Sequence, residues 1–110
     1  MQDKLIIVTR IKKTIDTIEK IIENYPHQEV ILKNRITETL YTLLELSYQA
    51  NIHKDKFYMS EIIVKLKMLD YYIKMSLDKK IISYKKYETV GNHLLEKNKM
   101  VLVWLNNEKS

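Results

Sequence analysis

Apolar residues recur along the chain in steps of three and four, the spacing of the buried stripe of an amphipathic helix. The pattern predicts four helices, at residues 3–24, 28–51, 56–80 and 83–107. At 1.5 Å per residue each helix should be roughly 30–37 Å long. The predicted buried stripes contain, helix by helix, Val8, Ile11, Ile15, Ile18, Ile22 and Tyr25; Leu32, Ile36, Leu40, Leu43, Leu44 and Ala50; Met59, Ile62, Leu66, Leu69 and Ile73; and Tyr87, Val90, Leu94, Val101 and Leu105.

Short polar segments separate these stripes. Pro26 disfavours helical geometry in the residue before it, so the first helix should end near Tyr25. Residues 51–56 are polar and form the second predicted connection, and Ser83 is a predicted N-cap of the last helix. Helices of similar length joined by short links pack as antiparallel neighbours. The predicted fold is therefore all-α, one up-down-up-down four-helix bundle spanning residues 1–110.

Composition supports this fold and bounds the setting. A single glycine and a single proline are too few for the turns of a sheet protein of 110 residues. The chain has no cysteine, which removes disulfides and thiolate chemistry and fits a reducing compartment. No apolar run approaches the roughly 20 residues that span a bilayer, and none resembles a signal peptide. We expect a cytoplasmic protein without a membrane partner.

The end of the fourth helix is apolar on every side. Residues 100–105 read MVLVWL, and a helix that is apolar all round is normally buried all round. A second chain is the simplest source of that burial, so we expect a homo-oligomer. The alternative is ragged packing of a broad core within one chain. The predicted interface residues are Met100, Leu102, Val103 and Trp104.

The sequence contains no recognisable catalytic or metal-binding constellation. His93 and Glu96 are three residues apart, like half of a carboxylate di-iron site, but Leu66 and Leu69 supply apolar side chains where the other half would stand. A solvated pair is the preferred interpretation. The lone glycine excludes a glycine-rich phosphate loop. Helical ribonucleases of the HEPN type have an arginine followed closely by a histidine, and this chain lacks that pair. We expect a non-enzyme with no cofactor, no metal and no small-molecule substrate.

The net charge of +5 lies entirely in the second half of the chain. Residues 1–53 carry seven basic and seven acidic side chains, whereas residues 54–110 carry twelve and seven. Clustered lysines attract phosphates by charge, with strong salt dependence and little sequence specificity. A solvated charged face is the alternative. The same choice applies to six tyrosines, which either stack on bases or, more commonly, bury the ring and leave the hydroxyl in water: Tyr41, Tyr48, Tyr71, Tyr72, Tyr84 and Tyr87.

Three short motifs in the second half of the chain carry a resemblance to a known family: KLKMLDYYIK at residues 65–74, Ile82-Ser83 followed by Tyr87, and EKNKM at residues 96–100 leading to Trp104. They resemble the Avd-like accessory proteins of diversity-generating retroelements. That group of four-helix bundles also includes proteins encoded in intervening sequences of bacterial 23S ribosomal RNA genes. The pairs at residues 35–36 and 50–51 also resemble the second helix of the family. Here Asn98, Leu102 and Val103 replace the closing glycines of the family pattern.

The resemblance implies a homopentamer of four-helix bundles with a basic surface. Such a protein would bind a reverse transcriptase and template RNA or DNA, and so support mutagenic copying of a template repeat. The alternative function is a structural or protein-interaction oligomer with no nucleic acid partner. The candidate binding residues are Arg35, Lys67, Lys74, Lys79, Lys80, Lys85 and Lys86.

Overall fold

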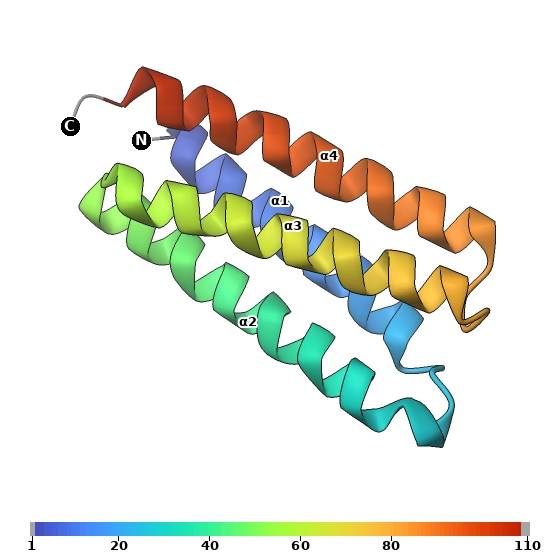
Figure 1. Cartoon of the computed structure of the whole chain (residues 1–110). Coiled ribbons are helices and arrows are strands. Elements are labelled where there is room, and N and C mark those ends of the chain that lie inside the picture. Colours follow the sequence, from blue (N-terminus) through green and yellow to red (C-terminus); the bar gives the residue numbers. More distant parts are fainter. Residues whose placement is uncertain (1, 109–110) are drawn as a thin grey trace.

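The computed structural model describes residues 2–108, with side chains from residue 6 onward. It contains four long helices, α1 (Gln2–Ile22), α2 (Val30–His53), α3 (Lys56–Asp78) and α4 (Tyr84–Asn107), and a short 3-10 helix, η1 (His27–Glu29). The long helices lie side by side in alternating directions (Figure 1). Each contacts its neighbour along the chain, and α1 contacts α4, which closes the bundle. The predicted all-α four-helix bundle is confirmed, and the helix bounds agree with the prediction to within two residues.

The core follows the predicted stripes closely. Every stripe residue of α1 and α3 is buried, from Val8 to Ile22 and from Met59 to Ile73, and the buried face continues to Tyr25. In α4 the stripe turns by one position at its end, so that Trp104 is buried and Leu105 is only half-buried. The polar side chains that lie among these apolar residues were not predicted to be buried: Thr14, Ser47, Ser76 and Lys97.

Local hydrogen bonds fix the three connections. The Asp55 carboxylate accepts from the backbone N–H of Phe57 at 2.8 Å and caps α3. Ser83 caps α4, as predicted. In the first connection the buried Tyr25 hydroxyl donates to Ser76 Oγ at 2.7 Å, which ties the end of α1 to α3. Burial is the main cause of the raised pKa of Tyr25. These links hold the connections close to the ends of the bundle.

Within residues 2–108, none of the helices combines the length and the apolar character that crossing a bilayer requires.

Candidate nucleic-acid interface

The connection from α3 to α4 is a tight helix end that carries a lysine where glycine is usual. Lys80 adopts the left-handed conformation, with φ of 62°. Its N–H donates to the Leu77 carbonyl and the Ile81 N–H donates to the Ser76 carbonyl, both at 2.9 Å. These two bonds define a Schellman motif, whose left-handed position is most often glycine. The Lys80 side chain is exposed at this turn.

Two more lysines lie in the first turn of α4. The Ser83 hydroxyl accepts from the backbone N–H of Lys86 at 3.2 Å, which leaves Lys85 and Lys86 exposed just inside the helix. This first turn contains no acidic residue. The N-terminus of a helix carries partial positive charge, so lysines there are unfavourable for stability but add to the attraction for anions. The start of α4 is therefore a strongly positive part of the surface.

The predicted lysines differ in how far other side chains neutralise them. Lys74 bonds to Asp78 at 2.9 Å, and this hydrogen bond is the main cause of the raised pKa of Lys74. Lys79 bonds to Glu29 at 2.8 Å. Among residues 6–108 the structure gives no ion pair for the other predicted basic residues, which are Arg35, Lys67, Lys80, Lys85 and Lys86. These five remain available to an external anion.

Most of the predicted basic residues gather at one end of the bundle. The turn after α3 and the start of α4 lie at the same end as the start of α2, which carries Arg35 (Figure 1). The ion pair between Lys79 and Glu29 joins the two connections directly. Lys67 lies apart, because twelve helical residues separate it from Lys79, about 18 Å at 1.5 Å per residue. We call the cluster of Lys79, Lys80, Lys85, Lys86 and Arg35 the basic end.

A shallow groove between α3 and α4 lies beside Lys67. It encloses about 330 Å³ and is lined by Leu66, Lys67, Asp70, Gly91, Leu94, Leu95 and Asn98. Gly91 is the single glycine of the sequence, and an added Cβ there would meet no atom within 4 Å. Neither a positive φ nor close packing within the described chain explains this glycine. The groove places Lys67 against the apolar surface of α4.

The tyrosines divide between the two interpretations. Tyr72 and Tyr87 are half-buried against the core, in line with the common role of this side chain. The other four of the six considered from the sequence are exposed: Tyr41, Tyr48, Tyr71 and Tyr84. A stacking role is thus sterically open at these four positions.

Comparison with models of known protein families identifies the family of this chain. Residues 5–108, nearly the whole chain, match the family model described as bAvd-like. The chain belongs to the bAvd-like family. It is a family of non-catalytic helical proteins, and membership implies an accessory role in diversity-generating retroelements. The resemblance drawn from the sequence motifs is confirmed. No curated protein matches the chain.

In this bAvd-like chain the predicted interface residues differ in how far they are exposed within a single chain. Trp104 is only 5 % exposed within a single chain, so its burial needs no second copy. Met100 is half-buried. Leu102 and Val103 are 39 % and 59 % exposed and remain free to contact another chain. Within one chain, therefore, only the side of this helix end that faces the bundle is buried, and burial of the other side by a second copy stays a prediction.

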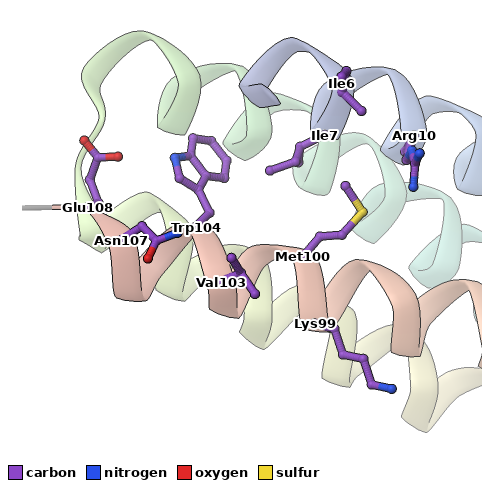
Figure 2. A pocket seen from close by; sticks show the side chains of 9 residues that line it. All are labelled: Ile6, Ile7, Arg10, Lys99, Met100, Val103, Trp104, Asn107 and Glu108. Atoms are coloured by element: carbon purple, nitrogen blue, oxygen red, sulfur yellow. The ribbon is translucent and has the colours of Figure 1, made fainter. Parts of the chain in front are cut away.

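A hollow of about 690 Å³ lies beside this helix end, between the end of α4 and the start of α1. Figure 2 shows the Trp104 indole and Met100 extending from α4 toward α1, whereas Lys99 points away. Ile7 of α1 is buried on the facing side, and Ile6 next to it is exposed. Apolar surface therefore continues from α4 across this hollow to α1.

The bAvd-like bundle also holds a polar seam between α1 and α4 that the sequence analysis missed. Thr14 Oγ1 and His93 Nδ1 share a hydrogen bond of 3.2 Å, and the buried Lys97 ammonium bonds to Glu96. Arg10 lies 4.0 Å from Glu96. Burial lowers the pKa of His93, with the positive charge of Lys97 lowering it further and Glu96 opposing the shift. His93 is thus half-buried and hydrogen-bonded to α1, whereas Glu96 is exposed to solvent.

Spacing alone places two residues of the seam at core positions. Lys97 lies three residues after Leu94 and four before Val101, so it occupies a core position of α4. Thr14 lies at the matching spacing between Ile11 and Ile18 in α1. No group of three or more His, Cys, Asp or Glu side chains in the described part of the chain is placed to hold a metal ion.

Proposed function

We propose that this protein binds single or duplex nucleic acid through its basic end and the adjoining face of α3, and that it associates with the reverse transcriptase of a diversity-generating retroelement. In that role it supports the mutagenic copying of a template repeat, and its nucleic acid partner is the template RNA or DNA. Membership of the bAvd-like family supports the retroelement setting. The observation that carries the binding role is the gathering of Lys80, Lys85 and Lys86 at one end without ion pairs among the described side chains.

The energetics favour phosphate as the ligand of this end. Lys85 and Lys86 stand in the first turn of α4 and Lys80 stands in a left-handed position, and each placement is unfavourable for the isolated fold. A bound phosphate offsets the repulsion among these charges and the helix dipole. Binding should weaken steeply with salt, because neutralised phosphates release counterions. Basic residues without intrachain partners gain most from such a ligand.

We propose further that the protein acts as a homo-oligomer, a pentamer by resemblance to its family. Repetition of the basic end around a ring would combine a few charges per chain into a continuous basic surface. The exposed Leu102 and Val103 support contact with a second copy. The rival function, an oligomer that contacts only proteins, predicts the same assembly without affinity for nucleic acid.

Charge reversal tests the binding site. We expect Lys85→Glu/Lys86→Glu and Lys67→Glu/Lys74→Glu to reduce binding of labelled RNA and DNA strongly. The slope of log affinity against log salt should fall by about one for each phosphate that the variant no longer neutralises. Fluorescence anisotropy over a salt titration measures both the affinity and the slope. Capture on the retroelement's immobilised reverse transcriptase measures binding of the second partner.

The matched control is Lys13→Glu/Lys20→Glu, two exposed lysines of α1 in the charge-balanced half. Equal losses from the control and the test pairs would reduce the effect to net charge and remove the site assignment. Absence of wild-type binding at low salt, with and without the reverse transcriptase, would leave the protein-interaction oligomer as the function.

A further inference from the structure

Two of the four exposed tyrosines already have partners within the chain. The Tyr41 hydroxyl donates to a Glu19 carboxylate oxygen at 2.6 Å, and this bond is the main cause of the raised pKa of Tyr41. The Lys12 ammonium lies 5.3 Å from the centre of the Tyr48 ring, in cation–π contact. Both tyrosines lie on α2, in the half of the chain whose charges balance. Their surface positions are explained by these contacts.

The other two exposed tyrosines are braced by aromatic rings instead. Tyr71 is 58 % exposed and packs edge-on against Tyr72, with ring centres 5.9 Å apart. Tyr84 is 64 % exposed and packs against Tyr87 at the same distance. Tyr72 and Tyr87 are half-buried and contact the core. An exposed ring held by an anchored neighbour loses little side-chain freedom on binding, so it is preorganised for a flat ligand.

These two rings stand among the candidate lysines. Tyr71 lies four residues after Lys67 and three before Lys74, so the three side chains share one face of α3. The pKa of Lys74 is raised mainly by Asp78 and to a small extent by Tyr87, which places the end of this face near the start of α4. Tyr84 is one turn before Tyr87, next to the basic end. Exposed aromatic rings and cations therefore alternate from the middle of α3 to the first turn of α4.

Acidic residues on the same surface limit what charge alone can do. Asp70 and Asp78 lie beside the lysines of α3, and Glu88 lies one turn after Tyr84. These carboxylates weaken the attraction for the phosphate backbone of a rigid duplex. The bases of a duplex are stacked on one another, so they present no free faces to this surface. A strand with unpaired bases offers planar faces as well, and stacking on an aromatic side chain contributes about 1–3 kcal/mol per base.

We propose that Tyr71 and Tyr84 are stacking platforms for unpaired bases, so that the nucleic acid bound by this protein is single-stranded or looped. The phosphates of the same strand lie on Lys67, Lys74 and the basic end. This inference rests on the proposed function and narrows its ligand class. RNA and DNA strands share the required chemistry, because every base has a π-face and the contacts do not involve the sugar.

The test compares three probes of one sequence, a single-stranded RNA, a single-stranded DNA and the DNA duplex, at fixed low salt. The full-length wild type should bind both single strands more tightly than the duplex. Tyr71→Ala and Tyr84→Ala should each weaken single-strand binding roughly 5- to 150-fold, the range that 1–3 kcal/mol represents, and leave duplex binding and the salt slope unchanged. Tyr71→Phe and Tyr84→Phe should bind as the wild type does, because the ring is retained.

Tyr41→Ala and Tyr48→Ala are matched controls and should not affect binding. A probe containing 2-aminopurine reports stacking directly, since its emission falls when it stacks, and Tyr71→Ala should restore that emission. Equal affinity of the alanine variants and the wild type for single strands would overturn the proposal, as would a parallel loss for the duplex. Tight, salt-sensitive binding of the duplex without preference for single strands would overturn it too, while the proposed function would stand.

Discussion

At the residue scale, polar side chains occupy core positions among the apolar residues of the bundle. The stripe from Ile11 to Ile22 is buried as its spacing requires. Lys97 occupies a core position too, but its type argued for the surface, and only the structure shows its ammonium group bonded to Glu96. Long lysine stems can lie along apolar surface while the charged end finds a partner. Such a lysine interrupts the apolar stripe in a hydropathy pattern, so the sequence analysis did not find the polar seam.

The seam gives stability a dependence on pH. Because the pKa of His93 is lowered in the fold, the unfolded chain holds more protons between that pKa and the ordinary value of about 6.5. The stabilisation from neutral His93 is therefore present above about pH 6.5 and is lost as pH falls below it, with Lys97 opposing protonation and Glu96 favouring it. Urea unfolding between pH 8 and 5 should show a smaller decline for His93→Gln than for the wild type. Superimposable profiles would contradict this assignment.

Lys80 offers a residue-scale test in which stability and binding change in opposite directions. A left-handed conformation costs an L-residue roughly 1–2 kcal/mol, which glycine avoids, although glycine loses more backbone entropy on folding. Lys80→Gly should raise the free energy of unfolding by about 1 kcal/mol and weaken nucleic-acid binding by removing a charge. Lys80→Ala removes the charge but keeps the strain, so it should weaken binding without stabilising. A stabilised alanine variant would show that charge repulsion, and not backbone strain, limits this turn.

At the scale of elements, the sequence located the helices and the Ser83 cap of α4, because proline and serine act locally, but it did not predict the cap of α3. Ser83 and Asp55 cap α4 and α3, and Pro26 precedes the short helix η1. The candidate site was predictable only in part. The charge asymmetry points to the second half of the chain, but the ion pair of Lys79 with Glu29 joins residues 50 positions apart. Pairing over such distances depends on the topology of the bundle, and it decides which lysines remain free.

The first turn of α4 is the element where binding and folding conflict most. Glutamates there interact favourably with the positive end of the helix, by about 0.3–1 kcal/mol each, whereas lysines do the reverse. Lys85→Glu/Lys86→Glu should therefore raise the melting temperature while it weakens binding. Most surface substitutions leave stability nearly unchanged, so a gain measured by thermal unfolding would be specific to this position. A loss of stability would show that the two lysines make a structural contribution.

At the scale of the whole molecule, the bundle measures 45 × 22 × 19 Å and exposes apolar side chains at both ends, with Val30 and Ile31 at the start of α2, near the basic end. Val103 and Ile6 lie toward the opposite end, where α4 finishes and α1 begins (Figure 2), and the exposed Leu102 precedes Val103 in α4. The end of α4 can therefore contact further copies of the chain without covering the basic end. Trp104 was predicted as an interface residue from its apolar type, which does not distinguish the side of a helix that faces its own bundle from the side that faces a neighbour.

Assembly and folding can therefore be tested with different substitutions on the same helix. Leu102→Ser/Val103→Ser removes exposed apolar surface, so we expect it to dissociate the oligomer while the bundle stays folded. Trp104→Ala removes a large buried side chain. It should therefore lower the free energy of unfolding of the single, dissociated chain by about 3–5 kcal/mol. Multi-angle light scattering gives the mass, and circular dichroism during urea unfolding gives the stability. A monomeric wild type at micromolar concentration would end the oligomer proposal. If Trp104→Ala dissociates the oligomer and leaves the stability of the bundle unchanged, then Trp104 contributes to the interface between chains.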